Sequence, residues 1–150
     1  MDALSDVLKS VHLEGAVYVN AEFTAPWCIR GECGLQSVKA KLAAAEHVAF
    51  FHFLTEGGCK VRPADGGEVL EVKAGDLVLF PTEGRHLMGT DLQLAPMEAE
   101  ALAAGNNPDR PEVYCLRHGG GGAMTRFVCG YLALSRSVSR PLLELSLIHI

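Results

Sequence analysis

The chain alternates apolar and polar residues in many short runs, and this pattern predicts β-strands. The runs are rich in Val, Phe, Leu and Tyr, and Gly, Pro, Asp or Asn residues bound them; they are GAVYVNAEF, HVAFFHFL, GCKVRP, EVLEVKA, DLVLFP, HLMG, EVYCLRH and MTRFVCGYLAL. No helical pattern is interleaved between these runs. The sequence therefore predicts an all-β sandwich or barrel rather than a sheet of alternating strands and helices.

Three other segments depart from this alternation. The opening MDALSDVLKSVHL places apolar residues at helical spacing, which predicts a short N-terminal helix that stops at Gly15. The Ala-rich and then Asn- and Pro-rich stretch between Asp91 and Glu112 predicts a long surface loop with one helical turn at Met97 to Ala104. The run Gly119 to Gly122 predicts a hairpin tip or hinge.

The C-terminal segment SRSVSRPLLELSLIHI is broken at Pro141 and then strongly apolar. Such an end rarely stands alone in water. It predicts a possible C-terminal helix and a segment that is packed on the barrel, used as a dimer contact, or the cut end of a longer chain.

Composition and charge narrow the classes of function. With 150 residues the chain is expected to form one domain, residues 1–150, and its net charge of -5 argues against a nucleic-acid-binding surface. No apolar run reaches the roughly 20 residues that span a bilayer, and no signal peptide is evident, so we expect a cytoplasmic protein that does not enter a membrane. Five cysteines, an odd number without a CxxC pair, predict reduced thiols.

The stretch from Phe50 to His86 resembles a cupin. It contains the turn TEGG, the run AGDLVLFP, and His86 five residues after Pro81, in the order of the second cupin motif, whose glycine here stands one place late at Gly84. The first cupin motif is poorer, because its ligand positions fall near Ala45, His47 and Phe50, of which only His47 can bind a metal. The three-histidine, one-glutamate site of cupin enzymes is therefore not intact.

A wider set of pieces resembles the N-terminal cupin-like sensor domain of AraC-type transcriptional regulators. In order along the chain they are MDALSDVLKSVHLEGAVY, TAPW, FHFLTEGGCKV, AGDLVLFP, RHLM, GGGGAMTRFVCGYLAL and SRPLLELSLIHI. The resemblance implies a double-stranded β-helix, or jelly-roll barrel, that binds a small effector or a metal. It also implies a homodimer that reaches DNA only through a helix-turn-helix region absent from this chain.

Two histidines are the leading candidates for the ligand site. Strand alternation places His52 on one face with Phe50 and Leu54, and His86 occupies the cupin ligand position that points toward the barrel mouth. With the thiol of Cys59 they would form a His2Cys set that suits zinc, with His47 in reserve. The alternatives are a core histidine bonded to a backbone carbonyl, and an apolar pocket in which both histidines orient an organic effector.

The remaining candidates are a tryptophan and the other cysteines. Trp27 is expected to pack against the barrel, with a ligand cap as the alternative. Cys28 and Cys33 lie in an expected loop where Arg30 would favour the thiolate, and the family resemblance permits a redox switch there. Cys115 and Cys129 lie in apolar strand runs, where a small buried side chain is the ordinary interpretation.

Two classes of function remain. The first is a non-enzymatic sensor whose ligand shifts a two-state equilibrium in an attached DNA-binding part. The alternative is a small metal-dependent cupin enzyme, which would need a complete ligand set and a positioned acid or base. Glu56 is a poor candidate for that acid or base because it lies in a turn. The missing ligands of the first motif favour the sensor.

Overall fold

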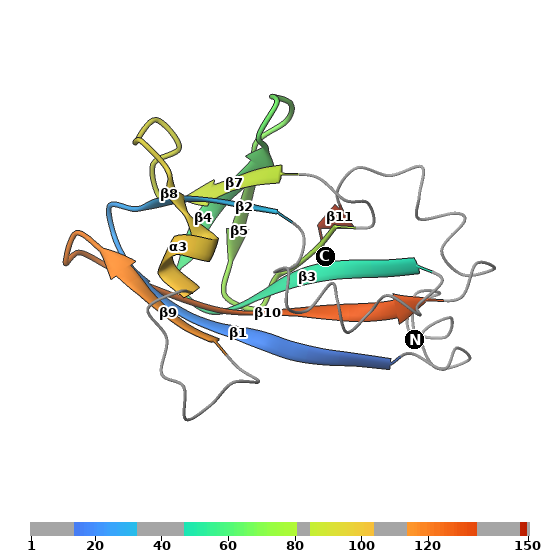
Figure 1. The fold of residues 1–150 in the computed structure, drawn as a ribbon. Helices are drawn as coiled ribbons and strands as arrows, with labels where there is room; N and C mark the ends of the chain where they lie inside the picture. Colours follow the sequence, from blue (N-terminus) through green and yellow to red (C-terminus); the bar gives the residue numbers. More distant parts are fainter. Residues whose placement is uncertain (1–13, 33–46, 81–84, 104–113, 135–147, 150) are drawn as a thin grey trace.

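The computed structural model describes residues 14–32, 47–80, 85–103, 114–134 and 148–149, which form two β-sheets facing each other (Figure 1). The first sheet has the order β11-β6-β3-β10-β1-β9, with β11 Ile148–His149, β6 Leu77–Phe80, β3 His47–Glu56, β10 Met124–Leu134, β1 Glu14–Thr24 and β9 Tyr114–Gly119. The second has the order β5-β4-β7-β2-β8, with β5 Leu70–Lys73, β4 Gly58–Pro63, β7 Arg85–Gly89, β2 Cys28–Glu32 and β8 Met97–Glu98.

The alternation of the sequence explains most of these strands. All eight predicted runs form strands, and the predicted helical turn appears as the short helix α3, Ala99–Ala103, directly after β8. The predicted N-terminal helix and most of the apolar C-terminal segment fall on residues 1–13 and 135–147, outside the described part. Ile148 and His149 pair with Leu79 and Val78 of β6, so this part of the C-terminal segment is a strand rather than a helix.

The segment from Cys28 to Glu32 was expected to be a loop, and this expectation is wrong. It forms β2, which pairs antiparallel with β7 and parallel with β8. Its sequence, CIRGE, has little β-propensity of its own, since Gly and Glu are depleted in strands. Backbone hydrogen bonds from two neighbouring strands supply what the local sequence lacks.

The core lies between the two sheets. It is built from the inward-facing residues of both, and its largest fully buried side chains include Trp27, Phe23, Phe127, Leu54 and Met88. Removing such side chains from water is the main favourable term in folding. In the first sheet the alternate residues of β3 point outward, and Phe53 remains 37% exposed.

The Gly119–Gly122 segment is not the hairpin tip that the sequence predicts. It joins β9 to β10, which lie on opposite sides of β1, so the chain must cross the end of β1. The amides of Gly120 and Gly122 donate to the carbonyl oxygens of Thr24 and Ala25 at 2.9 and 2.8 Å. This close approach of two backbones explains why the segment consists of glycines.

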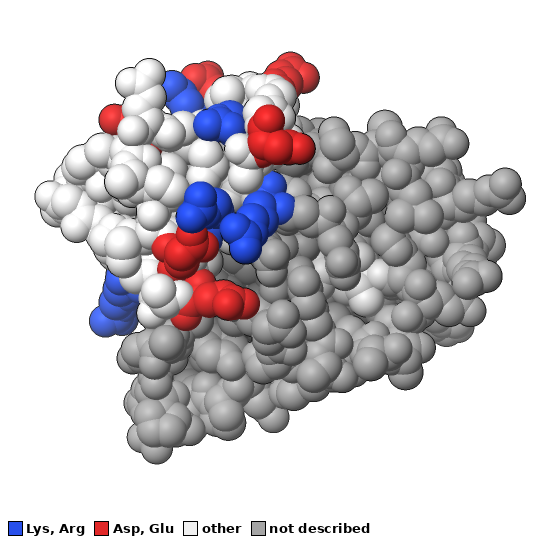
Figure 2. Space-filling view, turned by 45° about the horizontal axis from the view of Figure 1, so that its top comes forward, with Lys and Arg blue, Asp and Glu red and all other residues white. Residues whose placement is uncertain are grey.

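Charged side chains of both signs lie next to each other on the described surface (Figure 2). Arg126 pairs with Glu56 at 3.2 Å and Arg117 with Glu22 at 3.4 Å, while Arg30 pairs with Glu98. On the described part of the face in Figure 2, this mixing leaves no broad basic patch for phosphates. Within the described residues, no helix is long and apolar enough to cross a membrane.

The crossing at β1 predicts a graded response to alanine. Gly119 has φ +142° and a Cβ there would overlap the carbonyl oxygen of Thr24, whereas Gly121 has φ +87° and nothing within 4 Å of its Cβ position. Gly119→Ala should therefore lower the free energy of unfolding by about 2–5 kcal/mol, since backbone strain and overpacking add. Gly121→Ala, which meets only the strain, should cost about 1–2 kcal/mol. Urea titrations of both variants would measure the difference, and equal losses would contradict the crossing.

Candidate ligand-binding site

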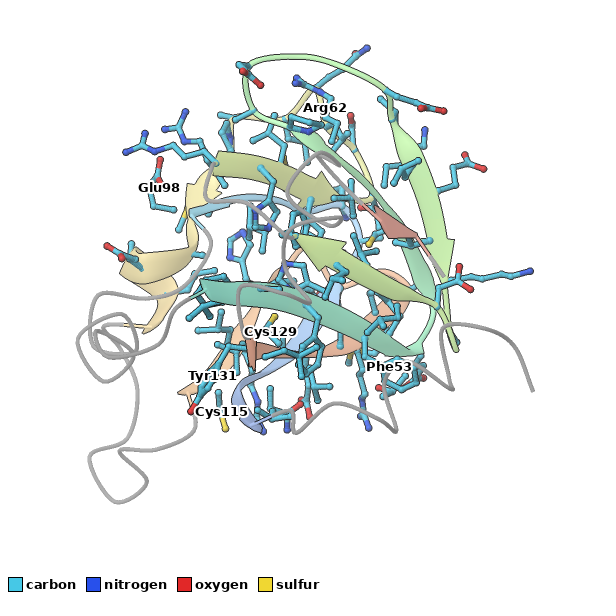
Figure 3. All side chains as sticks on the ribbon, turned by 90° about the vertical axis from the view of Figure 1, so that its right-hand side faces the viewer. Phe53, Arg62, Glu98, Cys115, Cys129 and Tyr131 are labelled. Atoms are coloured by element: carbon cyan, nitrogen blue, oxygen red, sulfur yellow. The ribbon has the colours of Figure 1, made fainter. Side chains whose placement is uncertain are left out.

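His52 enters the interior from the first sheet. On β3, Phe50 and Leu54 are buried and Phe53 is exposed, so the face shared by residues 50, 52 and 54 is the inner one, as the sequence predicts. Figure 3 shows Phe53 on the side of β3 that faces away from the second sheet. On the neighbouring strand β10, Cys129 is the residue paired with His52. The pairing therefore places a thiol and an imidazole side by side on the inner face.

His86 enters the interior from the second sheet. It lies on β7 and is 5% exposed, with Gly31 of β2 and Pro63 of β4 as its cross-strand neighbours. Phe80 stacks on the His86 ring at a centroid distance of 4.4 Å. Gly31 carries no side chain, which leaves room beside the His86 ring.

The two histidines meet between the sheets. The Nε2 atoms of His52 and His86 are 3.0 Å apart, and Nδ1 of His52 is 2.6 Å from Sγ of Cys129. The three side chains thus form a continuous chain of contacts, Cys129 to His52 to His86. The predicted convergence of the two histidines is what the structure shows.

The side chains around Cys129, His52 and His86 are apolar and aromatic. The ring centroids of Phe80 and Phe127 lie 5.2 and 5.6 Å from that of His52, each edge to face. Burial lowers the pKa of His86 from 6.5 to about 4. Burial, and secondarily the neighbouring His86, lowers the pKa of His52 well below 6.5. Both rings are therefore neutral at pH 7, and burial also raises the pKa of the Cys129 thiol well above 9, which keeps it protonated.

Two buried nitrogens in the interior have no hydrogen-bond partner. Among the described residues, the buried side-chain nitrogen and oxygen atoms without one are Nδ1 of His86 and Nε1 of Trp27. Trp27 is 1% exposed and packs its ring on Phe23 and Phe127, at 4.7 and 6.0 Å between centroids. Its place is within the core. A buried polar group without a partner costs about 1–3 kcal/mol, so these atoms mark positions that a bound molecule can satisfy.

Cys59 lies away from the two histidines. It is four residues along β4 from Pro63, the residue that pairs with His86, and four residues of strand span about 13 Å. Its thiol packs against Val72 in the core, and burial raises its pKa to about 12. The sequence suggested Cys59 from the chemistry of its thiol and could not place it along the sheet.

The described residues do not provide the ligand set for zinc that the sequence suggested. They contain no group of three or more His, Cys, Asp or Glu side chains suited to a metal ion. The side chain of His47, the reserve ligand, lies outside the described part of the chain, although His47 begins β3. Zinc binding by this protein therefore stays a prediction.

The cysteines proposed for a redox switch are not shown as a pair. Cys33 lies outside the described residues, and Cys28 begins the extended strand β2. Burial, and then Asp91, raises the pKa of the Cys28 thiol, with Arg62 opposing them. Arg30 was expected to favour the thiolate, but its Nε donates to Oε1 of Glu98 at 2.7 Å instead.

The surface also carries an open groove, but it lies elsewhere. Its lining includes the predicted site residue Cys59, together with Gly58, Lys60, Glu71, Val72, Lys73, Asp76 and Thr90, on the β4–β5 side of the second sheet. Its charges are of both signs, and among the described residues that line it there is no histidine. The histidine pair, with its unpartnered nitrogen in an apolar interior, is the better candidate for specific recognition.

The lowered pKa values predict a loss of stability in acid. An unfolded histidine takes up a proton near pH 6.5, whereas folded His86 does so only near pH 4, so stability falls as the pH drops through this window. Between pH 7 and pH 5, His86 alone should remove about 2 kcal/mol from the free energy of unfolding. Urea titrations across this range should show a reduced slope with pH for His86→Gln. An unchanged slope in His86→Gln would contradict the assignment.

Comparison with known proteins identifies the family of the chain. The solved structure of ToxT from Vibrio cholerae is similar, with 10% sequence identity and a TM-score of 0.37; the match covers 87% of this chain and 33% of that one. No curated protein matches the sequence. A family model described as a cupin matches residues 2–145, nearly the whole chain. The chain belongs to the cupin family, with its two sheets arranged as a cupin barrel.

Proposed function

We propose that this cupin is the effector-sensing domain of an AraC-type transcription regulator. The observation that supports it best is the neutral imidazole pair between the sheets, with Nδ1 of His86 unpartnered in an apolar interior. A polar anchor surrounded by aromatic walls is typical of a small-molecule binding site. The ordered motifs of the sequence, from the N-terminal segment to the C-terminal one, support the choice of family.

Binding rather than catalysis fits the contacts of the described residues. A cupin enzyme would use a metal with several converging ligands, whereas Nε2 of His52 and Nε2 of His86 contact each other and Nδ1 of His52 contacts Cys129. Glu56 pairs with Arg126 at the end of β3 and takes no part in the histidine site. A metal-dependent cupin enzyme is the alternative. Metal analysis of the purified protein, with a turnover screen in Fe²⁺, Mn²⁺ and Zn²⁺, would favour it if both gave positive results.

In this proposal the sensor acts within a larger regulator in the cytoplasm. Residues 1–150 form one ligand-binding domain, dimerise with a second copy, and contact DNA only through a helix-turn-helix region outside this sequence. The net charge of -5 is consistent with a domain that does not itself approach phosphates. Ligand binding shifts a two-state equilibrium that the DNA-binding region shares.

The site predicts that small molecules stabilise the protein through His86. In a thermal-shift screen of neutral and charged metabolite-sized compounds, ligands should raise the melting temperature of the wild type, because they bind only the folded state. His86→Leu, which replaces the imidazole by an apolar side chain of similar bulk, should abolish these shifts, and His118→Gln should retain them. The proposal would be contradicted if no compound in the screen raised the melting temperature, or if the compounds that did so bound His86→Leu equally well.

The chain alone should not bind DNA specifically. When it is fused ahead of a helix-turn-helix DNA-binding domain, the DNA affinity of the fusion should change by about fivefold or more when a ligand from the screen is added, a typical coupling between two sites. Fluorescence anisotropy at physiological salt measures both quantities, and the fusion carrying His86→Leu is the control. Specific binding by residues 1–150 alone, or a ligand-independent fusion, would argue against the sensor.

A further inference from the structure

The contacts of Cys129, His52 and His86 have a direction, because each nitrogen of a neutral imidazole is either a donor or an acceptor. The Nε2 atoms of His52 and His86, 3.0 Å apart, require one proton between them. Whichever ring donates, the proton on its partner and the role of the Cys129 thiol follow. The three side chains therefore have two possible arrangements of their protons. Nδ1 of His86 is protonated in one arrangement and bare in the other.

Counting satisfied groups distinguishes the two arrangements. If the Cys129 thiol donates to Nδ1 of His52, then Nε2–H of His52 donates to Nε2 of His86, and one N–H, on Nδ1 of His86, is left without a partner. In the reverse arrangement the Cys129 sulfur accepts a hydrogen bond from Nδ1–H of His52, and sulfur is a weak acceptor. The S–H of Cys129 and the bare Nδ1 of His86 then both lack a partner among the three side chains. The first arrangement leaves fewer groups unsatisfied in the apolar interior, and each such group is costly.

We propose that Cys129 is a positioning residue that fixes the tautomers of both histidines, so that the barrel presents Nδ1–H of His86 to an uncharged ligand carrying an oxygen acceptor, such as a carbonyl group. The ligand class rests on the proposed function as a sensor. The tautomers do not, because they follow from the contacts within the protein.

The second unpartnered nitrogen points to the same ligand chemistry. Nε1 of Trp27 can only donate, so both unsatisfied buried nitrogens in the described interior call for acceptors. An ionised carboxylate is a poor occupant, because His86 and Thr125 are the buried polar residues among those described and neither carries a positive charge. An uncompensated charge in such surroundings is expensive. A neutral carbonyl, facing the rings of Phe80 and Phe127, avoids that cost.

The tautomers can be measured without any ligand. Nitrogen-15 NMR of the histidine rings distinguishes protonated from bare nitrogens, and at pH 7 it should find His52 protonated at Nε2 and His86 at Nδ1. Cys129→Ala should mix the tautomers of both rings, since the donor to Nδ1 of His52 is gone. Cys129→Ser keeps a hydroxyl donor and should restore the wild-type pattern, a rescue that mere packing would not produce.

The matched control is Cys59→Ala, which removes the other inward-facing buried thiol, about 13 Å along the sheet from the pair. It should leave both tautomers unchanged, and dispersed amide spectra would show that each variant folds. A wild type with His86 protonated at Nε2, or a folded Cys129→Ala with unchanged tautomers, would overturn the role of Cys129. These outcomes do not depend on whether the protein is a sensor.

The ligand class is tested with three probes that share one ring: acetophenone, benzoate and benzylamine. Acetophenone, the neutral acceptor, should shift the His86 Nδ1–H resonance at millimolar concentration, and the two ions should not. Its affinity should fall roughly tenfold in Cys129→Ala and recover in Cys129→Ser, since one hydrogen bond is affected. A shift of this resonance caused by benzoate or benzylamine would overturn the ligand class. The absence of a shift with all three probes, as when a water molecule already bonds to Nδ1–H, would also overturn it. If the wider screen yields ligands of another class, the sensor proposal survives that result.

Discussion

Two sheets close on a shared apolar interior, and this constraint determines how each polar group inside it behaves. Of the two buried polar residues in the described chain, Thr125 is satisfied, because its hydroxyl donates to the carbonyl oxygen of Gly58 at 3.1 Å. His86 is satisfied at one nitrogen and not at the other. Since an unpartnered group of this kind lowers the stability of the fold, its presence points to a role other than packing. The same burial keeps both imidazoles neutral, so in the proposed function the interior would recognise a ligand by hydrogen bonds rather than by charge.

The position of the pair also connects ligand binding to the fold as a whole. Facing sheets are about 10 Å apart, and the two rings span this gap from opposite sides. His52 belongs to β3, which lies between β6 and β10, and His86 to β7, which lies between β4 and β2. A ligand that bonds to one ring alters a contact between central strands of both sheets. In the proposed sensor, that geometry would give a ligand a mechanical route to the outer strands of both sheets, which a site on one sheet would lack.

The alternation of the sequence predicted the strands well because each strand buries one face, a local property with a period of two residues. It failed where the pairing of distant strands decides the structure. β2 has a weak strand sequence and exists because β7 and β8 flank it. The glycine segment 119–122 crosses β1 because the first sheet places β9 and β10 on opposite sides of that strand, and no local pattern reveals such an order.

The site shows the same limit at the level of single residues. Alternation and the cupin resemblance identified His52 and His86, whose contact the structure shows. Cys59 was chosen as the third member because a thiol beside two imidazoles suits zinc, and Cys129 was interpreted as ordinary packing. Both cysteines are buried and face inward, so their faces could not distinguish them. The register between β3 and β10 does, because it places Cys129 opposite His52. The apolar run VCG around Cys129 carries no sign of this partner.

The chemistry that the site supports depends on Cys129, rather than the expected Cys59, being the cysteine that contacts the histidines. A thiol in the position imagined for Cys59 would join two imidazoles around a common point, which is how a metal is held. The thiol of Cys129 instead contacts Nδ1 of His52, on the side of the ring away from His86. Of the four ring nitrogens in the pair, three are then engaged within the protein, and Nδ1 of His86 is the one left open. One open nitrogen can anchor and orient a ligand, so this arrangement of the described residues supports the proposed recognition of a small organic molecule.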